Sequence, residues 1–307
     1  METFKINKND ANQRIDKFIR KAFPKLSLPA IFKYIRTKRI KVNNKKVEIN
    51  YKVLLNDEIS VYINDEFLTK EPNAMDFLLA KNDLKIVYED ENIIVVDKPI
   101  GIVVQDDNTK NPDTLCNRLL HYLYDKKLWD PSIETSFVPS FVHRLDRNTS
   151  GLIIAAKNVE SSRILSEKIK NREIEKYYIA HIHGIITPKT GVLHAYLTEK
   201  GNDNIVTVTN KPISSTSKEI ITEYTTISHD KSTSFIEVHL VTGRKHQIRA
   251  HLNYIGHPLV GEKKYITENF TKVQKNSYQE LVSDKIIFNF SSNAGILNYL
   301  NKKTIKK

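Results

Sequence analysis

The sequence is poor in cysteine, and Cys116 is the only one in 307 residues. A single cysteine can form neither a disulfide within the chain nor a cysteine-based zinc site, so disulfide-stapled and zinc-ribbon proteins are excluded. No apolar run reaches the roughly 18 residues of a membrane-spanning helix. The first residues carry charges with no apolar core behind them, unlike a secretory signal. We therefore expect a cytoplasmic protein without a membrane partner.

Several catalytic signatures are also missing. There is no glycine-rich phosphate loop, Ser150 lacks the G-x-S-x-G setting of a hydrolase nucleophile, and no acidic pair suggests ordinary glycoside hydrolysis. His246 and His251 are five residues apart, about 140° around a helix, so they would not share a face. His181 and His183 would share a strand face, but no acidic or cysteine partner is spaced to complete a site. We expect no metal and no cofactor.

Acidic residues are fewer than basic ones, and the imbalance is uneven along the chain. Lysine and arginine number 48 against 36 aspartates and glutamates, and residues 1–65 hold 15 basic and 7 acidic side chains. A small, strongly basic segment suggests a polyanionic partner, because neutralised phosphates release counterions. The alternative is a charge excess that only keeps a lysine-rich protein soluble. Charge alone does not separate the two.

Residues 1–63 have the pattern of a small α+β domain. Apolar residues at helical spacing predict a helix over 15–22 that ends before Pro24, and a second helix over 28–38. Short strands follow, with turns at 43–44 and near 56–57. The other positions of the second helix form a basic face that can lie on a phosphate backbone: Lys33, Arg36, Lys38 and Arg39.

The rest of the chain predicts a linker and one large domain. Residues 64–82 begin acidic, contain Pro72 and are predicted to be a linker. Residues 83–307 contain many apolar or alternating runs and few helical patterns, which predicts a large mixed or antiparallel sheet. The predicted fold class is therefore α+β, with a small basic helix-and-strand domain preceding the sheet domain.

Polar groups are densest in HRLDRNTSGLIIAAK, residues 143–157. Asp146 lies among Arg144, Arg147 and Asn148, just before an apolar strand. Nearby arginines would keep a carboxylate ionised, as a nucleophile requires. The structural alternative is a salt-bridged turn that only ends the strand, and the residues taken alone favour it.

A second basic cluster is TGRKHQIRAHLNYIGHPLVGEKKY, residues 242–265. It can be a solvated basic face, or an anion-binding or RNA-binding surface to which Arg244 and His246 contribute. Arg249 stands between Ile248 and Ala250, where it could lie beside a packed apolar face. Such an arginine would be a natural partner for Asp146.

These clusters, in this order, resemble the RluA-type family of RNA pseudouridine synthases. HRLDRNTSGL is similar to the family's catalytic motif, EKYYIAHIHG at 175–184 to its K-x-Y-x-A motif, and TGRKHQIRAHL with GHPLVGEKKY to its third. VVDKPIGIVV at 95–104 matches the opening strand and K-P-x-G turn. Residues 1–63 resemble an RNA-binding domain named after a small-subunit ribosomal protein. Four motifs in register make the resemblance specific.

The resemblance implies an isomerase that needs neither metal nor cofactor. Uridine in RNA becomes pseudouridine when the C1′–N1 bond breaks, uracil rotates and C5 bonds to C1′. Asp146 would be the essential catalyst, and Arg249 would pair with it. Tyr178 would stack on uracil or take the C5 proton, whereas Tyr177 would pack on the opposite strand face.

The remaining expectations concern substrate binding. Arg144 would hold a flipped-out RNA conformation or contact a phosphate, and Arg147, Arg244 and His246 would add substrate contacts. The expected substrate is ribosomal RNA of the large subunit, with transfer RNA as the alternative, and the protein is expected to be a monomer. The rivals are a non-catalytic RNA-binding or ribosome-assembly factor, and a glycosidic hydrolase that would release free uracil.

Overall fold

The computed structural model describes the chain except for residues 64–66, 68–74, 107–110, 201–204 and 267–277. Much of the expected linker lies outside the described residues. The described end of that segment is not extended, because Asp76–Leu79 form the 3-10 helix η2. Phe77 of η2 is buried and makes edge-to-face contacts with Tyr124 and Trp129. The packed core of the large domain therefore starts before residue 83.

The N-terminal domain has two helices beside a three-stranded antiparallel sheet of order β1-β3-β2. Helix α1 covers Ile15–Ala22, as the apolar spacing predicts. Strand β1, which the sequence pattern did not show, pairs with β3. The predicted turns are confirmed, since Asn43, Asn44 and Asn56 all have positive φ. The elements are β1 (Glu2–Lys5), α1, α2 (Leu28–Arg36), β2 (Ile40–Val42) and β3 (Glu58–Val61).

Helix α2 ends two residues earlier than predicted. Lys38 has a φ of 62°, a left-handed conformation that cannot continue a helix, and its amide donates to the Ile35 carbonyl. Lys38 and Arg39 therefore lie in the connection to β2. All four basic residues expected on one helical face are exposed, but only Lys33 and Arg36 belong to the helix.

The large domain is built on an eleven-stranded mixed sheet, and its class is α+β as predicted. The main path has the order β10-β9-β11-β12-β8-β13-β7-β5-β4, with β14 beside β13 and β6 beside β7. Among the strands that the structure describes, the β13–β7 pairing is the only parallel one. The strands are β4 (Ile86–Glu89), β5 (Ile93–Lys98), β6 (Ser140–Phe141), β7 (Ser150–Ala156), β8 (Ile174–His183), β9 (Thr190–Lys200), β10 (Ile205–Thr209), β11 (Lys218–His229), β12 (Thr233–Leu240), β13 (Leu281–Phe288) and β14 (Thr304–Lys306).

Few helices cover this sheet. Helix α3 packs on η2 and β6, α4 packs on β7 and on the 3-10 helix η3 (Gly295–Leu300), and α5 lies over β9, β10 and β11. Thr114 and Asn158 accept backbone hydrogen bonds at the starts of α3 and α4, which fixes where these helices begin. The helices are α3 (Leu115–Asp125), α4 (Val159–Lys170) and α5 (Gln247–Tyr254).

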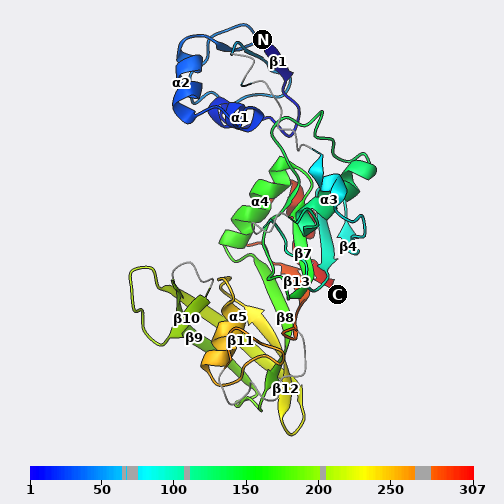
Figure 1. Cartoon of the computed structure of the whole chain (residues 1–307), viewed down its shortest axis with the longest axis vertical. Helices are drawn as coiled ribbons and strands as arrows, with labels where there is room; N and C mark the ends of the chain where they lie inside the picture. Colours follow the sequence, from blue (N-terminus) through cyan, green and yellow to red (C-terminus); the bar gives the residue numbers. More distant parts are fainter. Residues whose placement is uncertain (64–66, 68–74, 107–110, 201–204, 267–277) are drawn as a thin grey trace.

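A network of polar side chains joins the two domains. Figure 1 shows the N-terminal domain at one end of an elongated molecule, next to α4 and α3. Ser136 donates its amide and its hydroxyl to Oδ1 of the buried Asp10, over 3.1 and 2.6 Å. Glu134 accepts hydrogen bonds from Asn7 and Asn9. The N-terminal domain thus contacts the large domain through the segment between β1 and α1.

Helices in the described part of the chain are too short or too polar to cross a membrane.

Candidate active site

Asp146 lies on the loop between β6 and β7. Its carbonyl accepts the Thr149 amide in a tight turn, and the carboxylate is partly exposed. The loop leads into β7 through Gly151, which has a φ of +107°. A Cβ there would lie 2.1 Å from the Ser283 carbonyl oxygen, so only glycine allows β13 to approach β7 this closely.

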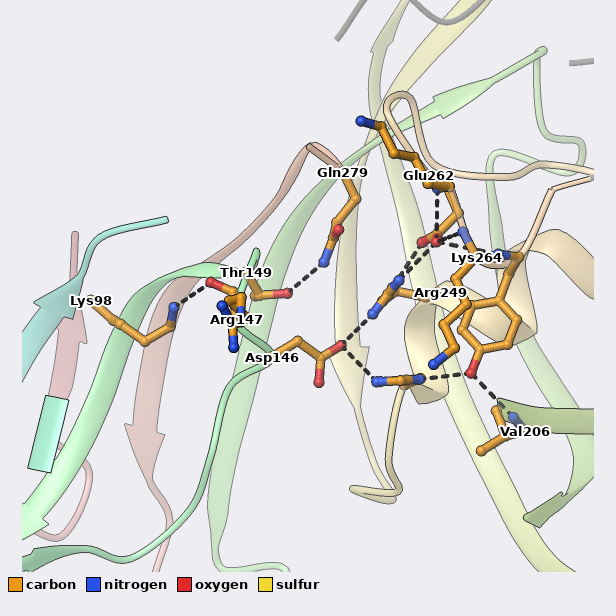
Figure 2. Close-up of polar contacts among 12 residues, drawn as sticks. Lys98, Asp146, Arg147, Thr149, Val206, Arg249, Glu262, Lys264 and Gln279 are labelled. Carbon is orange, nitrogen blue, oxygen red and sulfur yellow. Dashed lines mark hydrogen bonds and ion pairs between the residues drawn. The ribbon is translucent and has the colours of Figure 1, made fainter. Parts of the chain in front are cut away.

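Lys98 at the end of β5 fixes the other side of the Asp146 loop (Figure 2). Its fully buried Nζ donates to the carbonyls of Arg147, Ile102 and Pro99 over 2.9, 2.8 and 3.0 Å. The Gly101 amide also donates to the Arg147 carbonyl. Burial lowers the pKa of Lys98 to about 8, while the charge of Asp146 opposes this. Lys98 therefore connects the K-P-x-G turn to the residue that follows Asp146, a role the sequence did not indicate.

Arg249 lies opposite Asp146, on the first turn of α5. Its Nη1 donates to Oδ2 of Asp146 over 3.0 Å, although 103 residues separate them in sequence. The structure thus makes the contact between Asp146 and Arg249 that the sequence predicted. Arg144 and Arg147 also flank Asp146 in sequence, but their side chains are exposed. Arg249 is the arginine whose ion pair with Asp146 the structure shows.

Glu262 holds the rest of the Arg249 guanidinium, and sequence reasoning missed it. Nε and Nη2 of Arg249 donate to the two Glu262 oxygens, both over 2.8 Å. Backbone amides of Lys263, Lys264 and Tyr265 donate to Glu262 Oε1 as well. The side chain is fully buried. Burial alone would raise the pKa of Glu262, but the hydrogen bonds and charge of Arg249 lower it below its ordinary value.

This arrangement fixes the charge and the direction of the arginine. Burial alone would lower the pKa of Arg249, but its bonds to Glu262 and the charges of Glu262 and Asp146 raise it. Arg249 is therefore cationic, and a two-point fork to Glu262 sets its direction. In the sequence, Glu262 directly follows Gly261 in GHPLVGEKKY. Gly261 has a φ of +79°, and a glycine at this turn is the signal that could have drawn attention to the glutamate.

His246 approaches Asp146 from a second direction. Its Nε2 lies 3.8 Å from Asp146 Oδ2, and its Nδ1 lies 2.7 Å from the Tyr265 hydroxyl. That hydroxyl oxygen accepts the Val206 amide over 3.2 Å, so its own hydrogen can be donated to Nδ1 (Figure 2). The ring hydrogen is then on Nε2, toward the carboxylate. Burial lowers the pKa of His246 to about 4, and this histidine is neutral at pH 7.

The angle of about 140° between His246 and His251 assumed that both lie inside one helix. His246 lies outside it. It has a φ of 54° and is the residue before α5, whereas His251 is buried within α5. The two histidines are separated because they occupy different kinds of backbone. Among described residues, no three histidine, cysteine, aspartate or glutamate side chains are grouped to hold a metal ion.

Tyr178 is buried in the middle of β8, near Asp146 and Ser283. Burial raises the pKa of Tyr178 above its ordinary value, and the charge of Asp146 adds to this. Its hydroxyl is therefore protonated at neutral pH. Tyr177 points to the other face, as predicted, where it stacks on His239 with ring centroids 4.6 Å apart.

The predicted substrate-binding residues lie in two places. Arg144, Arg147 and Arg244 are exposed on the loops that carry Asp146 and precede α5. In the N-terminal domain, Lys33 and Arg36 line a groove of about 470 Å³. Arg39 lies over the Tyr34 ring, 5.8 Å from its centroid. The site near Asp146 and the basic groove are separate surfaces of one chain, and an extended polyanion could contact both.

Two family models match the sequence. The model described as RNA pseudouridylate synthase matches residues 92–254, which include both sides of the site around Asp146. The model described as S4 domain matches residues 13–59, within the N-terminal domain.

Similar proteins extend the match over nearly the whole chain. An uncharacterized RNA pseudouridine synthase of Mycoplasma genitalium is 36% identical over 289 residues, 93% of this chain and 88% of that protein. The ribosomal large subunit pseudouridine synthase C of Buchnera aphidicola is 31% identical and covers 89% of this chain and 83% of its own. The solved structure of human RNA Pseudouridylate Synthase Domain Containing 1 has a TM-score of 0.56 at 20% identity, covering 69% and 81%. That structure supports the fold.

Proposed function

This chain belongs to the RNA pseudouridylate synthase family, and we propose that it isomerises uridines of large-subunit ribosomal RNA by a reaction centred on Asp146. The activity is that of an isomerase acting on RNA. The observation that carries the proposed site is the buried Glu262–Arg249–Asp146 chain, which directs one arginine N–H at a partly exposed carboxylate. The fork between Arg249 and Glu262 keeps a cationic N–H directed at that carboxylate.

The reaction rearranges bonds within one nucleotide. The C1′–N1 bond breaks, the C5–C1′ bond forms, C5 loses its hydrogen and N1 gains one. We assign Asp146 as the nucleophile or electrostatic catalyst for breaking the glycosidic bond. Arg249 donates a hydrogen bond to it, and Nε2 of His246 lies 3.8 Å from the same carboxylate. Lys98 keeps the loop in place by binding the Arg147 carbonyl.

Tyr178 is suited to packing against uracil. Because its hydroxyl is protonated in the free protein, it can take the C5 proton only as a relay that passes its own proton to an acceptor such as Asp146. Arg144 is exposed beside Asp146 and is assigned to the RNA backbone around an extruded nucleotide. The groove at Lys33 and Arg36 supplies phosphate contacts that position the RNA without reading bases.

Ribosomal RNA is preferred over transfer RNA for two reasons. One relative that covers most of the chain is named a ribosomal large subunit pseudouridine synthase. The docked S4 domain places a second RNA surface at the far end of an elongated molecule, which suits an extended substrate. The cytoplasmic location and the monomeric state remain predictions of the sequence.

The test is tritium release from 5-tritiated-uridine RNA, with unmodified ribosomal and transfer RNA supplied separately. The C5 hydrogen leaves when C5 is bonded to C1′, so the proposal predicts release from the ribosomal pool. Release from transfer RNA alone would move the substrate to that class. Binding without release from either pool, or from ribosomal particles, would favour a non-catalytic assembly factor. Free uracil among the products would indicate hydrolysis.

A further inference from the structure

Lys176 is a partly buried lysine next to the active site, and the mechanism above does not use it. It lies on β8 two residues before Tyr178, so the two side chains share one face of the strand. A Cβ added to Gly243 would lie 3.6 Å from the Lys176 Nζ, which places this ammonium beside the turn that carries Arg244. Lys176 therefore lies between the two loops that carry the predicted site residues.

No acidic side chain in the described part of the chain forms an ion pair with Lys176, and no hydrogen bond of its Nζ is found there. The two fully buried lysines among the described residues of this domain have partners. Lys168 pairs with Glu173 over 2.8 Å, and Lys98 donates to three carbonyls. Burial lowers the pKa of Lys176, and nearby acids do not offset this effect. The Lys176 Nζ is not among the buried polar atoms that lack both a partner and solvent contact, so a ligand can reach it from outside.

The charges around Lys176 define that ligand. His143, on the Asp146 loop, is close enough for the Lys176 charge to act on it. Burial and that charge lower the His143 pKa to about 3, so the histidine adds no positive charge at pH 7. Arg144 follows His143 and Arg244 follows Gly243, and both arginines are exposed. The loops on two sides of Lys176 thus each carry an exposed arginine, a setting that suits a strongly charged anion.

We propose that Lys176 is a binding residue for an RNA phosphate, the one adjoining the nucleotide that reaches Asp146. This inference rests on the proposed function, because it requires RNA in the site. A phosphate oxygen would supply the missing partner of Nζ, and Arg144 and Arg244 would contact the same stretch of backbone from the two loops. Lys176 thereby fixes the position of the extruded nucleotide relative to Asp146 without contacting its base.

The experiment measures the dissociation constant for unmodified large-subunit ribosomal RNA over a series of potassium chloride concentrations. The full-length wild type is compared with Lys176→Met, Lys176→Arg and Lys285→Met. Lys285 is the matched control, because it lies on the other face of the sheet over the Tyr177 ring and pairs with Glu237 over 2.8 Å. The melting temperature of each variant is recorded alongside.

Lys176→Met should weaken binding about tenfold and lower the slope of log K against log salt by about one. Its melting temperature should stay close to that of the wild type, since no hydrogen bond or ion pair of the Lys176 Nζ is found among the described residues. Lys176→Arg should keep the slope, and Lys285→Met should leave it unchanged. A wild-type slope in Lys176→Met, or a large drop in its melting temperature, would overturn the proposal by showing no phosphate contact or a structural role.

Failure of this inference can be told apart from failure of the proposed function. The slope comparison measures binding and needs no turnover, whereas pseudouridine formation by the wild type needs no substitution. An unchanged slope in Lys176→Met, with an active wild type, would reject the phosphate contact alone. A lowered slope with an inactive wild type would reject the proposed activity and keep the contact.

Discussion

Arg249 and Asp146 meet over 3.0 Å from opposite sides of the site, and a buried glutamate sets the direction of the arginine. The Nε and Nη2 of Arg249 both donate to Glu262. The guanidinium therefore cannot rotate away from Asp146 without breaking two hydrogen bonds. The carboxylate therefore has a fixed cationic partner while it remains partly exposed to substrate. An arginine without the Glu262 partner would not have its guanidinium fixed in this direction.

Replacing Arg249 by lysine should lower kcat about 100-fold, because a single ammonium cannot bridge Asp146 and Glu262 as the planar fork does. Single-turnover tritium release measures the effect. Arg163→Lys, an exposed position on α4, is the matched control and should retain wild-type turnover. Wild-type turnover in Arg249→Lys would show that the fork geometry is not needed.

Glu262→Gln should lower the free energy of unfolding by about 3 kcal/mol, since removing one partner of a buried ion pair leaves the other charge uncompensated. Urea unfolding provides the measurement. Glu280→Gln removes a half-exposed partner of His181 and should cost under about 1 kcal/mol. Equal effects of the two substitutions would contradict the structural importance assigned to Glu262.

Stability should fall as pH decreases from about 6.5 to about 4. Burial lowers the pKa values of His246 and His251 to about 4. Ordinary histidines in the unfolded chain titrate near 6.5, so within this window the unfolded state binds more protons and is favoured. Urea unfolding at pH 7 and pH 5 should show the loss, and His251→Gln should reduce it. His229→Gln, at an exposed position, should leave the pH dependence unchanged.

Neutralising the groove of the N-terminal domain should weaken RNA binding without changing chemistry. The double substitution Lys33→Gln with Arg36→Gln should lower the slope of log K against log salt by about two, while kcat at saturating RNA stays constant. Lys231→Gln, in the β11–β12 turn at the opposite end of the molecule, is the control. An unaltered slope in the double variant would remove the RNA-binding role from α2.

Much of the local structure could be predicted from the sequence. The helix over 15–22 and the turns at 43–44 and near 56–57 follow from apolar residues at helical spacing and from clear turn residues, and the structure places them there. Strand β13 was harder, because a register shift between Ser283 and Lys285 breaks its alternation. Helix α2 was predicted too long because a lysine, rather than a glycine, takes the left-handed position at its end.

The candidate site was only partly predictable. The contact between Asp146 and Arg249 was expected from the order of motifs, and the structure shows it. Glu262 and Lys98 were not recognised, because their importance arises from burial against partners distant in the folded chain. A sequence shows their charges but not that Glu262 becomes fully buried against Arg249 or that Lys98 reaches the Arg147 carbonyl.

If the Asp146 carboxylate catalyses the isomerisation, Asp146→Asn should remove the activity. Wild type and variant are incubated with the same unmodified ribosomal RNA, and pseudouridine and tritium release are measured in single turnovers, with RNA affinity and melting temperature as controls. We expect Asp146→Asn to form no pseudouridine and to release no tritium, with RNA binding and folding nearly intact. Appreciable pseudouridine formation by the folded Asp146→Asn protein would contradict it.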